Sequence, residues 1–323
     1  MLDLFFIVVG LTGLVWSSDK FVEGAAAIAN HAGMPPLLIG MTIVSLGTSA
    51  PEIVVSLMAS LSGSGELAVG NALGSNITNV GLVLGVTLII RAIAIDASAT
   101  KRELPQMLIV TLLAGALMVD GSLSTTDGAL LLSVLVLFLV LLARRGDTET
   151  SQTTEPPTLP VAKAWGVFTV GLVLLVLSSR ALVFGAVNIA TALGVSELVI
   201  GLTIVAIGTS LPELAASVMS ALKGHADIAV GAIVGSNVFN LLVVLAIPGI
   251  FGPLSLNPSV MSRDWPVTLL TAGVLMLLAA LAFKRSKPSS RGSNELGRVS
   301  GVLLVTIYTT YMGILIFYPD FAL

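Results

Sequence analysis

The chain has 323 residues, of which 55% are hydrophobic and only 10% are charged, whereas about a quarter of an ordinary soluble domain is charged. This composition excludes most water-soluble folds and predicts an all-α polytopic membrane protein. The net charge of −3 comes without a basic cluster, which excludes nucleic acid as a partner. The absence of cysteine excludes thiolate metal sites.

Apolar stretches of membrane-spanning length follow one another along the chain, separated by short Gly, Pro or charged segments. We place ten spans, at residues 3–29, 36–62, 66–90, 104–120, 127–143, 163–192, 197–221, 226–250, 266–283 and 299–318. A polar, Thr- and Pro-rich linker at 144–160 separates the first five spans from the last five. The sequence therefore predicts one integrated transmembrane domain with a five-helix repeat at 1–143, a cytoplasmic linker and a second repeat at 161–323.

The two halves share a sequence repeat. GMTIVSLGTSAPE at 40–52 and GLTIVAIGTSLPE at 201–213 are identical at 9 of 13 positions, at an offset of 161 residues. The same offset aligns VGNALGSNITNV at 69–80 with VGAIVGSNVFNL at 230–241, and also aligns the two Ser-Ser pairs at 17–18 and 178–179. Because five spans are an odd number, the second copy enters the membrane from the opposite side, so the repeat is predicted to be inverted.

The basic residues indicate the orientation of the chain. With the N-terminus outside, 12 of the 15 Lys and Arg residues fall in inner loops or at inner span ends: Arg91, Lys101, Arg102, Arg144, Arg145, Lys163, Lys223, Lys284, Arg285, Lys287, Arg291 and Arg298. Lys and Arg are enriched in cytoplasmic loops. We therefore expect a multi-pass protein of the cell inner membrane with both termini on the non-cytoplasmic side.

A carboxylate lies in the middle of an apolar span twice, at equivalent positions. Glu52 and Glu213 each follow a Gly-Thr-Ser-x-Pro sequence, and an ionisable residue at this depth is a candidate functional residue because its burial is costly. The prolines before them have no N–H, which deprives the carbonyl oxygens of Gly47 and Gly208 of their helical partners. A cation is one partner that such freed oxygens can take.

Neutral oxygen donors accompany both carboxylates. Hydroxyl side chains recur at helical spacing on the Glu52 and Glu213 helix faces, and the third span of each half adds Ser and Asn side chains at equivalent positions. For Thr42, Thr203, Ser56 and Ser217, helix packing without a ligand is an equal alternative. An oxygen-only donor set suits hard cations such as Na⁺ and Ca²⁺. No nucleotide-binding or catalytic motif is present, so we expect neither a cofactor nor an enzyme.

GTSAPE with GNALGSNITN, and GTSLPE with GAIVGSNVFN, resemble the two α-repeats of the calcium/cation antiporter superfamily, sodium/calcium exchanger branch. The chain most resembles the compact bacterial inner-membrane members, which implies ten helices in two inverted five-helix repeats. The resemblance implies Glu52 and Glu213 as central carboxylates. It also implies neutral ligands from both halves, namely Thr48, Ser49, Ser75, Asn79, Thr209, Ser210, Ser236, Asn240 and the carbonyls of Ser45 and Ala206. Well-studied exchangers carry an Asp where this chain has Asn240, so the site here holds at most two formal negative charges.

These observations lead to one functional hypothesis with open alternatives. We expect a secondary antiporter that exchanges Na⁺ for Ca²⁺ across the lipid bilayer by alternating access. Coupling to H⁺ or K⁺, a passive cation channel, and an intramembrane enzyme with Glu52 and Glu213 as acid and base are the alternatives. The oligomeric state stays open, as does the role of Asp19, Lys20 and Glu23, which either pair locally or line an access path.

Overall fold

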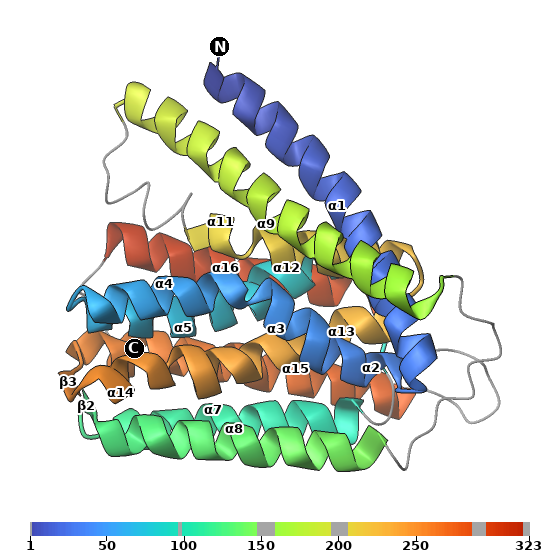
Figure 1. The fold of residues 1–323 in the computed structure, drawn as a ribbon. Coiled ribbons are helices and arrows are strands. Elements are labelled where there is room, and N and C mark those ends of the chain that lie inside the picture. Colours follow the sequence, from blue (N-terminus) through green and yellow to red (C-terminus); the bar gives the residue numbers. More distant parts are fainter. Residues whose placement is uncertain (1, 96–98, 147–158, 195–205, 286–294, 319–323) are drawn as a thin grey trace.

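The computed structural model describes residues 2–95, 99–146, 159–194, 206–285 and 295–318. Nearly all of these residues are helical (Figure 1). The strands in this part of the chain are four two-residue segments that form two antiparallel pairs. β1 (Ile93–Ala94) pairs with β4 (Glu295–Leu296), and β2 (Ser122–Leu123) pairs with β3 (Leu254–Ser255).

The first half contains a long helix, two interrupted helices and two further helices. Their bounds are α1 Leu2–Ala32; α2 Pro36–Ile39, η1 Gly40–Val44, α3 Ser45–Thr48 and α4 Ala50–Leu61; α5 Gly65–Thr78, η2 Asn79–Leu84 and α6 Gly85–Ile90; η3 Ala99–Glu103 and α7 Leu104–Met118; and α8 Thr125–Gly146. The η segments are single π-helical turns, and such turns interrupt the regular i to i−4 hydrogen bonds of a helix.

The second half repeats this order. Its bounds are α9 Val161–Ala192; α11 Ala206–Thr209 and α12 Leu211–Leu222; α13 Ala226–Phe239, η5 Asn240–Val244 and α14 Ala246–Phe251; η6 Val260–Asp264 and α15 Trp265–Arg285; and α16 Arg298–Phe317. Both ends of α12, α13 and η6 lie 161 residues after the corresponding ends of α4, α5 and η3. The sequence repeat is therefore also a repeat of helices and of the places where they break.

Seven described helices are long and apolar enough to cross a membrane. The pair Pro36–Thr48 and Ala50–Leu61, bent by 45°, makes eight if it counts as one span. The prediction of an all-α polytopic protein is thus confirmed, while the count of ten spans stays a prediction. Residues 197–205 of the predicted seventh span and 147–158 of the predicted linker lie outside the described residues, and α8 continues to Gly146.

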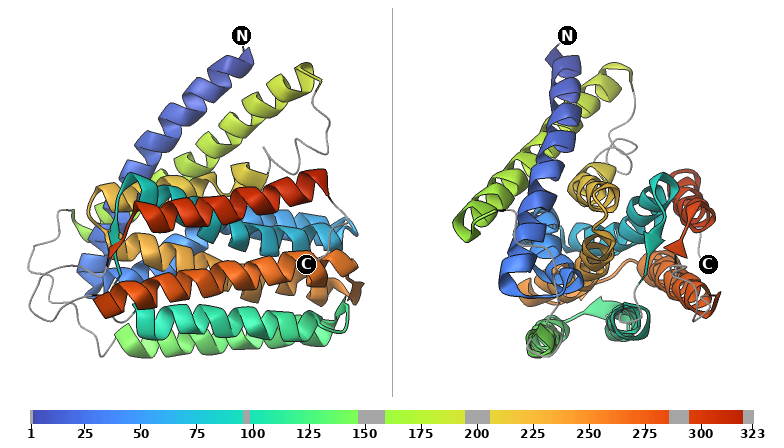
Figure 2. Two further views of the ribbon diagram at one scale, coloured as in Figure 1. Left: turned by 180° about the vertical axis from the view of Figure 1, so that it is seen from behind. Right: turned by 90° about the vertical axis from the view of Figure 1, so that its right-hand side faces the viewer.

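The helices form a bundle with one pair leaning away from it. Figures 1 and 2 show α1 and α9 side by side and inclined to the remaining helices, with the N-terminal end of α1 away from the bundle. The two helices run antiparallel, and glycine residues of each helix lie against the backbone of the other. A Cβ on Gly10 would lie 2.7 Å from the backbone nitrogen of Leu182, and one on Gly24 would lie 2.5 Å from that of Phe168. Small residues allow such backbone contact in membranes, so the pair packs as one unit.

Within the bundle, the interrupted helices of the two halves cross each other closely. A Cβ on Gly40 of η1 would lie 2.6 Å from the carbonyl oxygen of Ile228 in α13, and one on Gly235 would lie 2.5 Å from that of Met41. A continuous apolar core that includes Leu73, Leu241 and Ile233 surrounds this crossing. The crossing places Ser45, near the end of the first half's interrupted helix, against Gly235 of α13, which adjoins Ser236.

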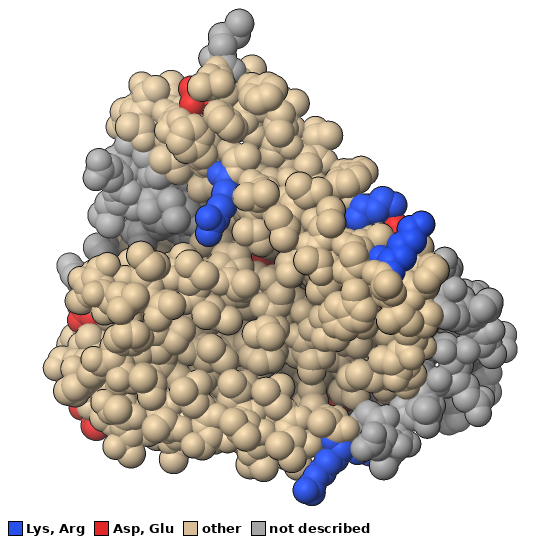
Figure 3. All heavy atoms as spheres, in the orientation of Figure 1, with Lys and Arg blue, Asp and Glu red and all other residues tan. Residues whose placement is uncertain are grey.

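The outer surface is mostly uncharged. The face drawn in Figure 3 carries few Lys, Arg, Asp and Glu side chains, which sit in small groups separated by wide uncharged areas. Many large apolar side chains of the outer helices are exposed, including Phe5 at 59%, Val140 at 43% and Leu303 at 44%. Exposed apolar area of this extent suits contact with lipid.

Candidate cation-binding site

Each half contains one helix break of the same geometry. The helical path is interrupted at Ser49, with φ −81° and ψ 3°, and at Ser210, with φ −90° and ψ 5°. Pro51 and Pro212 occupy the first turn of the following helix, α4 or α12, where a missing N–H costs no hydrogen bond. The breaks therefore set Glu52 and Glu213 in the first turn of a helix, where the positive pole of the helix dipole favours a carboxylate.

The two carboxylates come together from opposite halves of the chain. Glu52 and Glu213 are 1% and 4% exposed, and they lie within electrostatic range of each other. The Ser49 hydroxyl donates to Glu213 Oε1 at 3.3 Å, and the side chain of Thr48 also interacts with the Glu213 carboxylate. The Oε2 atom of each glutamate is buried with no hydrogen-bond partner among the described residues. Two buried carboxylates at one place strongly favour a bound cation.

Neutral oxygen atoms at several predicted positions are also buried with no hydrogen-bond partner in the described part of the chain. They are Asn79 Oδ1, Ser210 Oγ, Ser236 Oγ and Asn240 Oδ1, and the amide nitrogen of Asn240 has no partner within the described structure either. Buried polar groups are nearly always hydrogen-bonded in proteins. Asn79, Ser236 and Asn240 belong to η2, α13 and η5, which contact α12 or α4, and neutral oxygens of this kind suit a hard cation. Ser75 is buried as well, at 5% exposure.

The predicted carbonyl donors differ between the two breaks. The Ser45 carbonyl oxygen accepts the amide of Ser49 at 2.9 Å and the Thr48 hydroxyl at 3.3 Å. In the second half, the Ser210 amide donates to Ile207 O at 3.1 Å, one residue beyond Ala206. The Ser45 oxygen thus has two donors in this conformation, whereas the Ala206 oxygen does not receive the equivalent amide.

Asn71 was not singled out from the sequence, and the contact that Asn76 makes was not predicted. The Asn71 amide donates to the carbonyl oxygen of Glu52 at 3.0 Å and to Ser56 Oγ at 3.1 Å, which fixes the first turn of α4 against α5. The sequence repeat does not point to Asn71, because its aligned residue is Ala232. Its spacing of four residues from Ser75, which places both on one helix face, is the signal that could have found it. The Asn76 amide donates to Asn237 O at 3.1 Å and joins α5 to α13.

Several other polar residues singled out in the sequence have structural partners. Thr42 donates to Leu38 O at 2.7 Å within its own helix, and Thr203 lies outside the described residues. Asp19 pairs with Lys223 at 2.8 Å, and Lys20 pairs with Glu23 at 2.7 Å. These charges therefore pair locally and with the end of α12.

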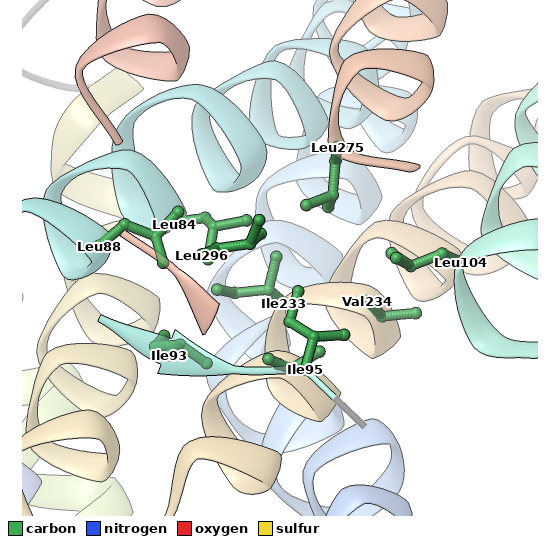
Figure 4. A pocket seen from close by; sticks show the side chains of 10 residues that line it. Leu84, Leu88, Ile93, Ile95, Leu104, Ile233, Val234, Leu275 and Leu296 are labelled. Carbon is green, nitrogen blue, oxygen red and sulfur yellow. The ribbon is translucent and has the colours of Figure 1, made fainter. Parts of the chain in front are cut away.

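A separate pocket in the core has a different character. Figure 4 shows it where α6, β1, α13, α15 and β4 meet, lined by aliphatic side chains such as Leu84, Ile233 and Leu275. Hydrocarbon side chains offer no ligand to a cation. Among the described residues there is no group of three or more His, Cys, Asp or Glu side chains that could hold a metal, so the formal charge of the candidate site rests on its two glutamates.

Broken membrane helices with oxygen donors at the breaks are typical of secondary transporters, and this fold and donor set place the chain in that class. Residues 2–144 and 163–317 match the family model described as sodium/calcium exchanger protein. The chain therefore belongs to the sodium/calcium exchanger family, which is a family of transporters rather than enzymes.

Individual relatives match along nearly the whole chain. Inner membrane protein YrbG of Escherichia coli is 41% identical, over 96% of this chain and 95% of its own. Sodium/calcium exchanger MaX1 of Methanosarcina acetivorans is 28% identical, over 96% and 97%. A solved structure of the sodium-calcium exchanger NCX_Mj superposes with a TM-score of 0.83 at 31% identity and covers 97% of this chain and 98% of that one. The expected family and membrane character are thus confirmed, and the ion specificity and coupling stay predictions.

Proposed function

We propose that this protein is a secondary antiporter that exchanges Na⁺ for Ca²⁺ by alternating access. Na⁺ entering down its gradient drives Ca²⁺ out of the cell, and no cofactor takes part. The observation that carries the proposal is the pair of buried glutamates, Glu52 and Glu213, held at two equivalent helix breaks with unpartnered oxygen atoms around them. The family and the sodium/calcium exchangers among the relatives support the choice of ions.

The proposed ligands are the two carboxylates with neutral oxygens from both halves. They are Glu52, Glu213, Thr48, Ser49, Ser75, Asn79, Thr209, Ser210, Ser236, Asn240 and the carbonyls of Ser45 and Ala206. With Asn at both 79 and 240, two negative charges neutralise either one Ca²⁺ or two Na⁺. Both loads at once would leave excess positive charge in a low-dielectric interior, which is costly. The two ions therefore exclude each other, as exchange requires.

The proposed topology has ten spans in two inverted five-helix repeats, with both termini on the non-cytoplasmic side of the cell inner membrane. Helix bounds that recur at the offset of 161 residues support the repeat. The distribution of Lys and Arg supports the orientation. An inverted repeat supplies two related conformations, one open to each side of the membrane.

Transport in inside-out membrane vesicles tests the proposal. We expect an outward-directed Na⁺ gradient to drive ⁴⁵Ca²⁺ uptake, and Glu52→Gln or Glu213→Gln to abolish it. Glu66→Gln is the matched control, because Glu66 is an exposed residue in the first turn of α5. Uptake by both site variants at the control rate would contradict the proposal.

Ion replacement in the same vesicles separates the alternatives. Uptake driven by a proton gradient without Na⁺, or uptake that requires K⁺, would assign a different coupling ion. Dissipative Ca²⁺ flux without any counter-ion would identify a channel.

A further inference from the structure

The two helix breaks share the sequence Gly-Thr-Ser-x-Pro-Glu but have different partners. The proline after each break has no N–H to donate to the carbonyl oxygen four residues before it, which is Gly47 O in the first half and Gly208 O in the second. Freed carbonyl oxygens in a membrane interior need another donor. The structure shows a side-chain donor at one of them.

At the second break, the donor comes from the inclined helix pair. The hydroxyl of Ser179 in α9 donates to Gly208 O at 2.7 Å, and Ser179 is 4% exposed. Beside this bond, Val183 of α9 covers Gly208, with its Cγ2 atom in the space that a Cβ would occupy. Helix α9 thus packs against, and hydrogen-bonds to, the helix break that precedes Glu213.

At the first break, the equivalent side-chain bond is not made, and Gly47 O instead accepts a backbone amide at the end of α3. The residue that aligns with Ser179 is Ser18 in α1. Its hydroxyl donates instead to Val15 O of its own helix at 3.0 Å, although the side chain is buried. Gly47 is covered by Leu172, which again belongs to α9 rather than α1, and a Cβ there would lie 3.0 Å from Leu172 Cδ2.

The α9 residues at the breaks have identical counterparts in α1. Leu172, Ser179 and Val183 share one helix face, since they are spaced by seven and four residues. Their aligned residues are Leu11, Ser18 and Val22. In this conformation Ser18 and Val22 are buried but Leu11 is 53% exposed, so Leu11 is not packed on a break as Leu172 is.

We propose that Ser179 and Ser18 are alternating positioning residues of the exchanger. Ser179 holds the Gly208 carbonyl in the conformation of this structure, and Ser18 holds the Gly47 carbonyl in the opposite conformation. The proposal rests on the inverted repeat and on the alternating access proposed above. When α1 and α9 move together across the bundle, Ser18 changes its acceptor from a carbonyl of its own helix to Gly47 O. In the same motion Ser179 changes its acceptor from Gly208 O to a carbonyl of its own helix.

The two serines then have opposite effects on one equilibrium. Ser179→Ala leaves Gly208 O without its side-chain donor in this conformation, and Ser18→Ala leaves Gly47 O without one in the other. The net worth of a single hydrogen bond corresponds to roughly a two- to tenfold change in an equilibrium constant. We expect shifts of that size in opposite directions, and the double variant should return to within about twofold of the original chain.

Distance measurements in lipid nanodiscs test this directly. The chain has no cysteine, so spin labels can be placed at Asp120→Cys in the turn after α7 and Leu193→Cys at the end of α9, both exposed. Pulsed electron paramagnetic resonance over a Na⁺ titration then reports the populations of the two conformations. Ser178→Ala is the control, because Ser178 adjoins Ser179 but lies against Gly13 of α1. Ser179→Thr keeps the hydroxyl and should keep the original populations.

Opposite shifts for Ser179→Ala and Ser18→Ala, with none for Ser178→Ala, would support the proposal. Shifts in the same direction, no shift, or a single distance throughout the titration would overturn it. A second readout is the Ca²⁺ KM measured from the two faces of the membrane, which the two variants should change in opposite senses. Since the distances do not depend on which ion is coupled, failure of Na⁺-driven Ca²⁺ uptake would be recognised separately.

Discussion

Gly235 is the place where an added methyl group should damage both the crossing of the two halves and the site. A Cβ there would lie 2.5 Å from the carbonyl oxygen of Met41 and from Ser45 Oγ, whereas ordinary contacts are 3.4–4 Å. The backbone at Met41 has no flexible end that can move aside, so Gly235→Ala must separate η1 from α13 by about 1 Å.

The magnitude follows from two opposing effects. Overpacking of this kind costs about 1–3 kcal/mol, and replacing a helical glycine by alanine returns up to about 1 kcal/mol. We expect a net loss of about 1–2 kcal/mol, seen as a fall of about 1.5–3 °C in the melting temperature of the purified 323-residue protein. The Ca²⁺ KM should also rise, because Ser45 is displaced.

Gly273→Ala is the matched control. Gly273 lies in α15, and a Cβ there meets no described atom within 4 Å. It should melt at or above the original temperature, because only the helix-propensity effect applies. If Gly235→Ala melts no lower than Gly273→Ala and leaves the KM unchanged, the close crossing of η1 and α13 is wrong.

Three further predictions concern the site. Because two carboxylates neutralise one Ca²⁺ or two Na⁺, exchange should be electroneutral. A K⁺ diffusion potential imposed on vesicles should therefore change ⁴⁵Ca²⁺ uptake by less than about twofold. Strong dependence of uptake on voltage would show that net charge moves in each cycle. Asn71→Ala removes the hydrogen bonds to Glu52 O and Ser56 Oγ and should raise the Ca²⁺ KM by roughly two- to tenfold, measured in the same vesicles; an unchanged KM would show that Asn71 does not position Glu52. Ca²⁺ at a hundredfold excess over its Kd should stabilise the protein by about 2.7 kcal/mol in thermal unfolding, and a shift of equal size in Glu52→Gln would place the ion elsewhere.

Much of the architecture could be predicted because membrane spans leave a strong signal. Apolar length and the Gly-Thr-Ser-x-Pro-Glu repeat were enough to indicate a disturbed helix at Pro51 and Pro212 and to single out Glu52 and Glu213 as carboxylates within apolar spans. Both effects are local, since a proline and a buried carboxylate impose their consequences on their own helix.

The partners of these residues could not be predicted in the same way. Asn71 holds Glu52 O although its aligned residue is Ala232, and Ser179 reaches Gly208 O while Ser18 does not reach Gly47 O. A sequence repeat predicts the same contacts in both halves. In a single conformation of a protein that alternates between two, the two halves make different contacts. The contacts that differ between the halves are therefore the ones that only a structure reveals.

The glycine contacts between α1 and α9 carry a consequence for the surroundings of the protein. Since the two backbones touch at Gly10 and Gly24, and again where Gly171 and Gly185 meet α1, neither helix can be displaced without the other. The pair presents an exposed apolar face that includes Leu4, Val8 and Val173. Any motion of the pair then drags this face through the hydrocarbon tails. The viscosity and thickness of the bilayer should therefore affect the turnover rate through friction on this pair. The affinity for ions should not depend on them, because the ions bind in the bundle.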